Sequence, residues 1–270
     1  MRLSEELAWR GFTNQTTFQN PEDVDVPRKL YFGVDPSADS MTIGNLAAAM
    51  MVRWFLEYSH EVYLLVGGAT GMIGDPDGKK DERELRSAET VRENSEAIID
   101  QYRHLFSGKD LEIVNNADWF AHINYIDFLH EIGKHMPMTQ LLDRAFVQTR
   151  IGEGGSGISY AEFSYSLIQG YDFLHLYREH GVTLQLCGAD QWGNSTTGVT
   201  LIRKLEAGEA HGYSTPRVIN KATGQKFGKS EGGAIWLSPE KTSVYQFYQF
   251  WLNVDDEGVI DYMKIYTMLD

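Results

Sequence analysis

Short turns that lead into helices, and lysines in glycine-rich loops, are the parts of this sequence that could hold phosphate. The turn from Asp35 to Asn45 follows an apolar run and precedes a helical pattern. The start of a helix offers free N–H groups and the positive end of the helix dipole, and both suit an anion. The alternative is an ordinary turn whose helix is capped by Ser40 or Thr42, because such caps are routine.

Two later loops resemble a Walker phosphate-binding loop without matching it. In the loop 67–80 that motif requires glycine at position 73 and serine or threonine at position 80, where the chain has Ile73 and Lys80. In the loop 226–230 the preceding glycine, Gly224, lies four residues before Gly228 instead of five. The two lysines of this loop could still bind polyphosphate as point charges, the alternative being a solvated surface loop.

A third group of polar residues lies on one predicted helix. Tyr165, Gln169 and Asp172 share one helix face, because they are spaced at i, i+4 and i+7. Buried polar groups need partners, so these three either satisfy one another or bind a polar ligand. The segment 185–194 follows at the end of a predicted strand, where its side chains can point into a pocket.

Composition excludes several classes of protein. The 270 residues carry 24 Lys and Arg against 38 Asp and Glu, so the net charge of −14 argues against a protein that coats nucleic acid non-specifically. The single cysteine, Cys187, excludes an intrachain disulfide and fits a reducing compartment. No apolar stretch approaches the roughly 18 residues of a membrane span, and the acidic N-terminus does not resemble a signal peptide. No zinc-type Cys/His set occurs.

The elements that must position these residues alternate between strands and helices. This alternation predicts a doubly wound parallel α/β sheet, in which ligands bind at the carboxyl ends of the strands. The predicted strands are 28–34, 62–66, 111–114, 183–187 and 217–220. The predicted helices are 4–11, 43–58, 87–106, 119–134, 138–149, 160–180 and 193–206, with further helix in the last 30 residues.

Five motifs in one order give the chain a family resemblance. They are YFGVDPSADSMTIGN, LVGGATGMIGDPDGKK, FSYSLIQGYDF, LQLCGADQWGN and KFGKSEGG. Together they resemble the bacterial-type tyrosyl-tRNA synthetases, which are class I aminoacyl-tRNA synthetases, from about Tyr31 to the C-terminus. The resemblance implies a Rossmann-like catalytic domain that activates L-tyrosine with ATP and transfers it to tRNA(Tyr). It also implies a homodimer, a cytoplasmic location and no membrane association.

The resemblance assigns roles to individual residues. Tyr31 and Asp172 would bind the hydroxyl of the substrate tyrosine. Its ammonium group would be bound by Tyr165, Gln169 and Asp75, and Gln191 would lie beside its carboxylate. ATP would be bound by Gly33, Asp35, Ser37, Gly44, Gly188, Asp190 and Lys229. The catalytic group would comprise Lys226, Lys229, Thr42, Asn45, Lys79 and Arg83, of which Lys79 and Arg83 would contact the departing pyrophosphate. Mg²⁺ would accompany the ATP phosphates, and no structural metal is expected.

Two features depart from the family pattern. The HIGH signature reads Thr42-Ile43-Gly44-Asn45, so both histidines are absent. Loss of one preorganised donor costs ~10²–10³ in rate, and we hypothesise that Asn45 takes the role of the second histidine. The chain also stops at Asp270, so we expect a truncated form or a natural fragment without the anticodon-binding region.

The resemblance further predicts how residues 1–270 are organised. Residues 118–164 would form a helical insertion at the dimer interface, unless their apolar side chains pack on the chain's own core. Residues 221–233 would form a mobile KFGKS loop, and residues 240–270 would begin a C-terminal helical region. Two other functions stay open: a catalytically weakened module that binds tyrosine or RNA, and a tryptophan-activating relative, against which Tyr31 and Asp172 argue.

Overall fold

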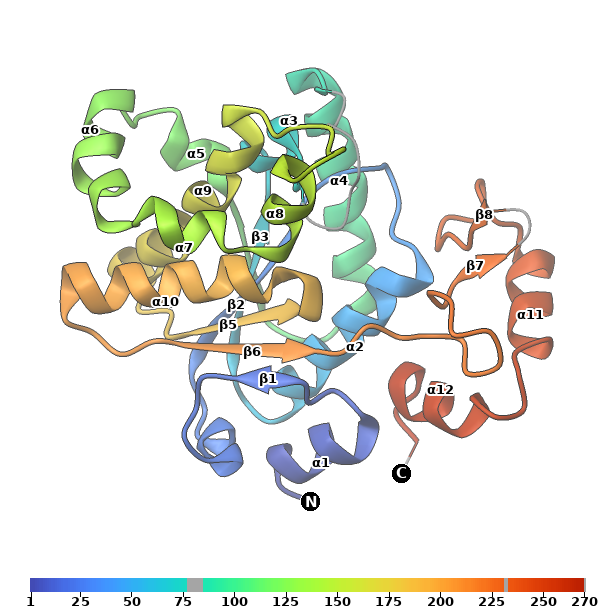
Figure 1. Cartoon of the computed structure of the whole chain (residues 1–270). Helices are drawn as coiled ribbons and strands as arrows, with labels where there is room; N and C mark the ends of the chain where they lie inside the picture. The colour runs from blue at the N-terminus through green and yellow to red at the C-terminus, as the bar shows by residue number, and fades with distance from the viewer. Residues whose placement is uncertain (77–84, 231–232, 270) are drawn as a thin grey trace.

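The computed structural model describes residues 1–76, 85–230 and 233–269 (Figure 1). The strands are β1 (Gln15–Thr16), β2 (Lys29–Val34), β3 (Glu61–Val66), β4 (Leu111–Asn115), β5 (Leu184–Gly188), β6 (His211–Thr215), β7 (Lys229–Ser230) and β8 (Gly233–Ala234). The α-helices are α1 (Leu3–Arg10), α2 (Ile43–Glu57), α3 (Thr70–Ile73), α4 (Ala88–Leu105), α5 (Asn116–Phe120), α6 (Tyr125–Glu131), α7 (Met138–Leu142), α8 (Ala145–Ile151), α9 (Tyr160–His180), α10 (Trp192–Glu206), α11 (Val244–Leu252) and α12 (Val259–Tyr266). Short 3-10 helices are η1 (Pro21–Asp25), η2 (Gly133–His135) and η3 (Ala189–Gln191).

The main sheet has six strands in the order β1-β6-β5-β2-β3-β4. All its pairs are parallel except β1 with β6. From β2 the chain first winds outward through β3 to β4, and later returns to the other side of β2 as β5 and β6. The sheet is therefore doubly wound, as predicted, and its order reverses between β2 and β5, which is where such folds bind ligands.

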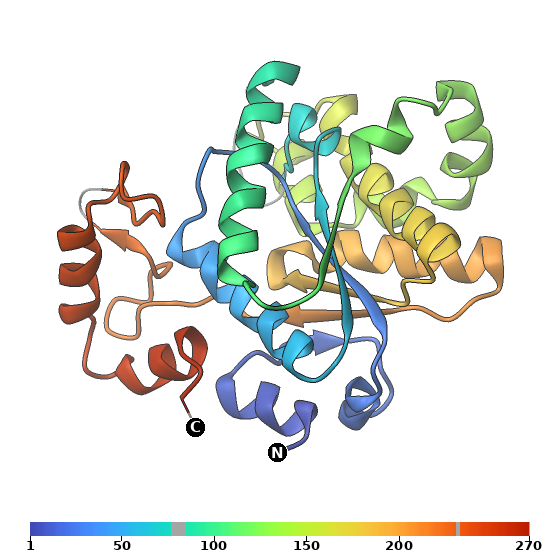
Figure 2. The same cartoon turned by 180° about the vertical axis from the view of Figure 1, so that it is seen from behind.

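Alternation along the strands builds two separate cores. Leu30 and Phe32 of β2 belong to a core with α2 and α4, whereas Tyr31 belongs to a core with α9 and α10. Successive side chains of a strand point to opposite faces, so this parity decides what each residue can touch. Figure 1 looks onto the face covered by α9 and α10, and Figure 2 onto the face covered by α2 and α4. Tyr31 is thereby placed on the face that α9 covers.

Local capping explains why most predicted helices begin and end where they do. Helix α9 begins after Ser159, whose hydroxyl accepts from the Glu162 N–H, and it ends at Gly181, which has φ 71°. Such a capping box satisfies donors at the helix start, and glycine adopts the left-handed conformation at the end without strain. Helix α1 ends at Gly11 in the same way.

Two predicted helices and one predicted strand are wrong. The region 119–134 contains the end of α5, then α6 and η2, because Asn124 caps a new helix by accepting from the Ile126 N–H. The region 138–149 is likewise divided into α7 and α8. The segment 217–220 forms only an isolated bridge between Ile219 and Lys226, and the last parallel strand is β6 instead.

The N- and C-terminal helices are joined by one buried arginine. Arg10 pairs with Glu6 at 2.6 Å, and its side chain has no exposed surface. Its guanidinium also donates to the carbonyls of Lys264, Thr267 and Leu269, which follow or end α12. Helix C-termini leave carbonyls without intrahelical partners, so Arg10 acts as a cap supplied from a distant part of the sequence.

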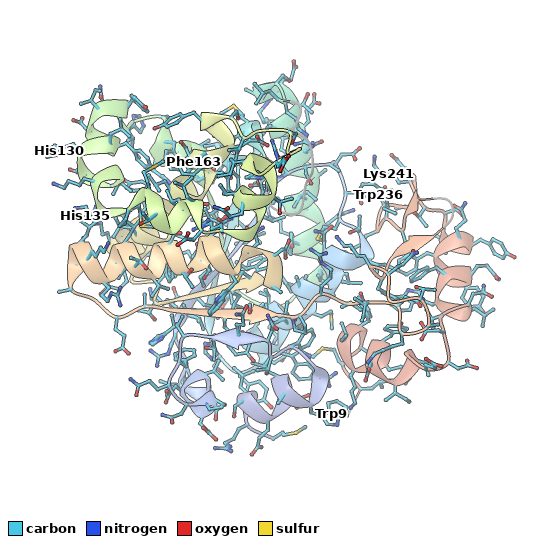
Figure 3. The ribbon with its side chains drawn as sticks, viewed as in Figure 1. Trp9, His130, His135, Phe163, Trp236 and Lys241 are labelled. Carbon is cyan, nitrogen blue, oxygen red and sulfur yellow. The ribbon has the colours of Figure 1, made fainter. Side chains whose placement is uncertain are left out.

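The C-terminal elements lie to one side of the main sheet (Figure 1). They connect to the start of α2, because Ile43 N–H donates to the Ile235 carbonyl at 3.0 Å and Leu237 N–H to the Met41 carbonyl at 2.8 Å. Figure 3 shows Trp236 and Lys241 together in this part, and the Lys241 Nζ lies 5.1 Å from the Trp236 ring centroid. Among the helices of the described ranges, none has both the length and the apolar character needed to traverse a bilayer.

Candidate active site

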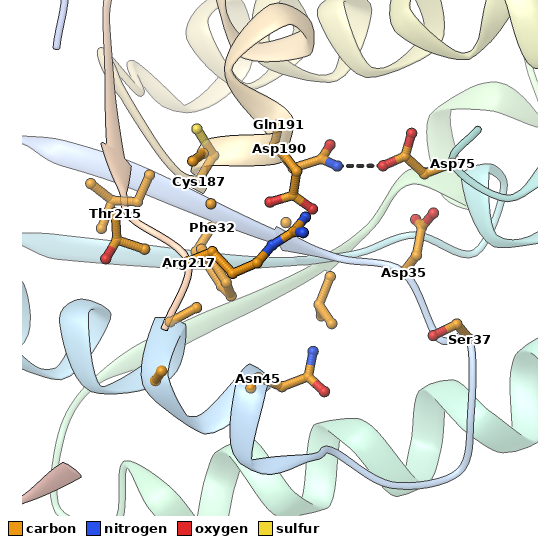
Figure 4. A pocket seen from close by; sticks show the side chains of 18 of the residues that line it. Phe32, Asp35, Ser37, Asn45, Asp75, Cys187, Asp190, Gln191, Thr215 and Arg217 are labelled. Atoms are coloured by element: carbon orange, nitrogen blue, oxygen red, sulfur yellow. Dashed lines mark hydrogen bonds between the residues drawn. The ribbon is translucent and has the colours of Figure 1, made fainter. Parts of the chain in front are cut away.

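A pocket of about 580 Å³ opens at the carboxyl ends of the central strands (Figure 4). Its walls come from the turn after β2, the start of α2, the loop after β3, one face of α9, the turn after β5, and the segment after β6. These segments are far apart in the sequence and meet where the strand order reverses. The pocket therefore occupies the place that the doubly wound fold predicts for a ligand.

Most of the predicted site residues line this pocket. They are Tyr31, Gly33, Asp35, Ser37, Thr42, Gly44, Asn45, Asp75, Tyr165, Gln169, Asp172, Gly188, Asp190, Gln191 and Lys226. Lys79 and Arg83 lie outside the described residues. Lys229 is described by its backbone, as part of β7, which pairs with β8.

The deep end of the pocket holds a phenol and a carboxyl group. Tyr31 is 1% exposed, and no hydroxyl partner occurs for it in the described structure. Asp172 is also 1% exposed and accepts hydrogen bonds from Asn116 Nδ2 at 3.1 Å and Trp119 Nε1 at 2.9 Å. A buried hydroxyl without a partner is costly, so Tyr31 retains an unused capacity to bind a polar group.

Burial controls ionisation at this end of the pocket. It raises the pKa of Asp172 from 3.8 to about 8, although the bonds from Asn116 and Trp119 oppose the shift. Burial, and next the negative charge of Asp172, raise the pKa of the Tyr31 hydroxyl well above its ordinary value. Desolvation disfavours the charged form of each group, so both are protonated at neutral pH.

A second polar group forms the middle of the pocket. Tyr165 donates its hydroxyl to Asp35 Oδ2 at 2.7 Å, and Thr70 donates to the other oxygen of Asp35 at 2.7 Å. Gln191 Nε2 donates to Asp75 Oδ2 (Figure 4). Carboxylates and a hydroxyl can accept hydrogen bonds from an ammonium group, and the N–H of an amide can donate to a carboxylate. Because these side chains face one space, they can bind both groups of one ligand.

The glycines of the loop after β3 permit this arrangement. A Cβ on Gly67 would lie 2.1 Å from Asp35 Oδ1 and 2.3 Å from Thr70 Oγ1, and a Cβ on Gly68 would lie 2.2 Å from Asn115 Oδ1. Side chains at these positions would displace the polar groups of the site. The glycine-rich loop thus lets the backbone approach Asp35 closely. This role differs from the phosphate binding of a Walker loop.

The start of α2 is a closed capping box. Thr42 N–H and Thr42 Oγ1 both donate to Asn45 Oδ1, at 2.9 and 2.8 Å, and Asn45 N–H donates to Thr42 Oγ1 at 3.4 Å. Of the two caps expected at this turn, Thr42 is the one that forms. Thr42 and Asn45 both face the pocket, and the amide Nδ2 of Asn45 makes no bond within the described ranges.

The loop that carries Lys226 is anchored by its phenylalanine. Phe227 is 4% exposed and stacks on Tyr262 with ring centroids 4.1 Å apart. It also contacts Phe250 and Trp251 of α11. A Cβ on Gly44 would lie 3.7 Å from Lys226 Cε, so this lysine reaches the first turn of α2.

Several residues of the site were not predicted from the sequence. Asn116 and Trp119 hold Asp172. Gln185 belongs to the segment 185–194 that was expected to point into a pocket, and it lines the pocket with a buried amide oxygen that has no partner in the described structure. Arg144 binds Asn194 Oδ1 at 2.7 Å, and Asn194 Nδ2 binds Gln191 Oε1 at 3.1 Å. The only signal for Asn116 was its place two residues after a predicted strand, and Arg144 lies far from any motif.

The lone cysteine also lines the pocket. Burial raises the pKa of Cys187 to about 12. The nucleophilic species of cysteine is the thiolate, so this thiol is inert at neutral pH. No group of three or more metal-binding side chains occurs within the described ranges.

Comparison with known proteins relates this geometry to a family. The family described as tRNA synthetases class I (W and Y) matches residues 25–270. A tyrosine–tRNA ligase of Ligilactobacillus salivarius is 46% identical over 273 residues, and one of Geobacillus kaustophilus is 48% identical over 282 residues. Each alignment covers 100% of this chain and 65% of the relative. The chain thus spans about 65% of the length of these curated relatives.

Solved structures agree with this assignment. A C-terminally truncated mitochondrial tyrosyl-tRNA synthetase of Aspergillus nidulans superposes with a TM-score of 0.84 at 26% identity, covering 100% of this chain and 81% of that one. A tyrosyl-tRNA synthetase of Archaeoglobus fulgidus, complexed with L-tyrosine, has a TM-score of 0.73 at 15% identity and supports the fold alone; it covers 98% of this chain and 81% of that one. The doubly wound sheet, the pocket at its switch point and the match over residues 25–270 show that this chain belongs to the class I tRNA synthetases, in the family of the tryptophan and tyrosine enzymes.

Proposed function

We propose that this chain activates L-tyrosine with ATP, forming tyrosyl-adenylate and pyrophosphate. The observation that carries the proposal is the buried pair of Tyr31 and Asp172 at the deep end of the pocket. The Tyr31 hydroxyl has no partner in the described structure, and the Asp172 carboxyl group is protonated at neutral pH. A phenol hydroxyl entering between them could accept the carboxyl proton of Asp172 and donate to the Tyr31 oxygen, whereas phenylalanine would leave that proton and the Tyr31 hydroxyl without a partner.

The rest of the amino acid fits the middle of the pocket. Tyr165, Gln169 and Asp75 would bind the ammonium group, and Gln191 would lie beside the carboxylate. In support, Gln169 Oε1 is buried without a partner in the described part of the chain. Asn194 Nδ2 donates to Gln191 Oε1 and thereby orients the Gln191 amide. The ammonium group would compete with Gln191 for Asp75, which would free the amide of Gln191 for the carboxylate.

The nucleotide would occupy the outer part of the pocket. Gly33, Asp35, Ser37, Gly44, Gly188 and Asp190 line that part and would contact ATP. The carboxylate of tyrosine is already ionised and attacks the α-phosphorus itself, so the reaction needs no general base. The protein's contribution is to align the two substrates and to stabilise the negative charge that develops on the phosphates.

The cations for this charge are three lysines and an arginine of two loops. Lys226, Lys229, Lys79 and Arg83 would contact the phosphates, and the loop 221–233 would move about its anchored Phe227 as it does so. Mg²⁺ would arrive with ATP, because it is usually held by substrate phosphates together with one or two carboxylates. The pocket offers such carboxylates in Asp35 and Asp190. Asn45 would supply its free amide in place of the second histidine of the HIGH signature.

The wider role proposed is the charging of tRNA(Tyr) in the cytoplasm, by a homodimer. Residues 118–164 would form the helical dimer interface. This region exposes large apolar side chains, among them Tyr125, Ile126, Met138 and Tyr160, each with more than half of its surface accessible. Light scattering at micromolar concentration should give the mass of two chains, and a monomer mass would contradict the dimer. Residues 240–270 would begin the C-terminal helical region, and the anticodon-binding region would follow in the longer relatives.

The experiment that tests the proposed activity is tyrosine-dependent ATP–pyrophosphate exchange. We expect exchange with tyrosine and none with phenylalanine or tryptophan. Exchange with tryptophan in place of tyrosine would support the tryptophan-activating alternative. An increase in melting temperature with tyrosine, in the absence of exchange, would support a tyrosine- or RNA-binding module. The closed capping box of Thr42 and Asn45 is the observation that keeps this last alternative open.

A further inference from the structure

The TIGN turn can offer a nucleotide only one side-chain group as a donor. The hydroxyl proton of Thr42 is directed to Asn45 Oδ1 at 2.8 Å, so it is used inside the turn. The same amide oxygen also accepts from the Thr42 N–H. What remains is Asn45 Nδ2, which is neutral. A site that handles a triphosphate needs more positive charge than this turn provides.

Arg217 brings a cation to the same pocket from a different element. It follows β6, two residues after Thr215, and lines the pocket. Figure 4 shows its side chain extending into the pocket, with the guanidinium directed toward the side that holds Asp190. No motif and no resemblance singled out this residue in the sequence.

The backbone ties Arg217 to the loop of Lys226. Ile219 and Lys226 form an antiparallel bridge, and Phe227 N–H donates to the Val218 carbonyl at 3.0 Å. Arg217 and Lys226 therefore lie on the two neighbouring segments of one short ribbon, and both line the pocket. The anchoring of Phe227 against Tyr262 holds this ribbon in place.

The guanidinium of Arg217 is uncommitted. Within the described ranges it makes no hydrogen bond and no ion pair, and the residue is exposed. A structural arginine is normally paired, as Arg10 and Arg144 are in this chain. An unpaired guanidinium held over a ligand pocket has its rigid fork of donors available for an anion, and this fork matches phosphate oxygens.

The negative charge of a bound nucleotide would favour a cation at this position of the pocket. The described lining carries four carboxyl groups and three cations: Asp35, Asp75, Asp172 and Asp190 against Arg86, Arg217 and Lys226. With Asp172 protonated, three carboxylates balance these three cations, and ATP would add several further negative charges. Of the three cations, Arg217 and Lys226 share one ribbon, so they can act on the same group.

We propose that Arg217 is an ATP-binding residue whose guanidinium holds the phosphates and replaces the donor that Thr42 has lost to its capping box. This inference rests on the proposed function, because it requires ATP in the pocket. It places the triphosphate against the pocket-lining segment that follows β6. It also explains how a chain with TIGN in place of two histidines can still stabilise phosphate charge.

The test measures binding of the ATP analogue α,β-methylene-ATP with Mg²⁺ by equilibrium dialysis, with adenosine as the matched ligand without phosphates. For Arg217→Leu we expect about tenfold or more weaker binding of the analogue and less than about twofold change for adenosine. Arg217→Lys should recover part of the affinity, because it keeps the charge and loses the fork. The control Arg203→Leu removes the same charge from the exposed last turn of α10 and should change neither ligand.

A double-mutant cycle tests the link to Thr42. Thr42→His should strengthen analogue binding more in the Arg217→Leu background than in the wild type, because the two donors substitute for each other. The melting-temperature increase caused by tyrosine should be the same in every Arg217 variant, which shows that the fold and the amino-acid site are intact.

Three results would overturn the inference. They are unchanged analogue binding in Arg217→Leu, an equal loss of analogue and adenosine, and no analogue binding by the wild type. Absence of tyrosine-dependent exchange would count against the proposed activity alone. The binding comparison decides the role of Arg217 in either case, because it requires no turnover.

Discussion

Replacing Asp172 by asparagine should change the way stability depends on pH. Burial raises the folded-state pKa of this carboxyl group from 3.8 to about 8. Between pH 5 and pH 7 the folded chain therefore keeps a proton that the unfolded chain has released. A raised folded-state pKa contributes stability that is fully present below pH 3.8 and is lost as pH rises toward 8. Asp172→Asn removes this loss, because the amide does not titrate.

The expected size follows from the linkage relation. One proton of difference costs about 1.36 kcal/mol per pH unit, so wild type should lose about 2.7 kcal/mol relative to Asp172→Asn between pH 5 and pH 7. With unfolding entropy of about 2.1 cal/mol/K per residue, this corresponds to about 5 °C in the difference between the two melting temperatures. Taking the difference between the two proteins cancels every other titrating group.

The assay is urea or thermal unfolding of both proteins at pH 5, 6 and 7. Leu176→Val is the matched control, because it alters a fully buried residue of the same helix, one turn later, without changing any charge. Its stability difference from wild type should be the same at all three pH values. A pH-independent difference for Asp172→Asn would refute the reasoning. It would mean that the hydrogen bonds from Asn116 and Trp119 outweigh burial and keep the carboxylate ionised.

Three further substitutions test other parts of the structure. Arg10→Met should lower the free energy of unfolding by about 3–5 kcal/mol in urea titrations, because it leaves Glu6 buried and unpaired. Adding Glu6→Gln should restore part of the lost free energy, and no restoration would contradict the ion-pair account. Tyr31→Phe should reduce the preference for tyrosine over phenylalanine in exchange assays. It should not lower stability, since the lost hydroxyl has no partner in the described structure. An unchanged preference would argue against a role of Tyr31 in binding the substrate hydroxyl. Gly198→Ala should cost about 1–3 kcal/mol in the same titrations, because the new Cβ would lie 2.7 Å from Phe173 Cβ, and an unchanged urea midpoint would contradict this close helix packing.

The prediction of elements succeeded where the signal is local. Helix α9 was predicted from residue 160 to residue 180, and the structure has the same bounds, because Ser159 and Gly181 are short-range start and stop signals. The apolar runs of β2, β3 and β5 were recognised as buried strands for the same reason. In contrast, β6 has the sequence HGYST, which lacks an apolar run. It is a strand because β5 pairs with it on one side and β1 on the other.

The site divides in a similar way between sequence and structure. Tyr165, Gln169 and Asp172 were placed on one helix face from their spacing, and all three line the pocket. Their partners could not be predicted, because Asp172 is held by Asn116 and Trp119, which lie 56 and 53 residues away. Contacts of this kind depend on how the helices cross the sheet, and short-range patterns carry no information about that.

The sequence by itself determined most of the strand–helix alternation, the ends of helices such as α9, the family resemblance and many of the polar residues that line the pocket. Each of these depends on residue type and local spacing, which act before any tertiary contact forms. Only the tertiary structure decided that Thr42 and Asn45 satisfy each other, that Arg217 lines the pocket, and that burial governs Asp172. Hydrogen-bond partnership, desolvation and charge proximity are properties of the assembled site, because segments far apart in the chain meet only when the sheet and its crossover helices are in place.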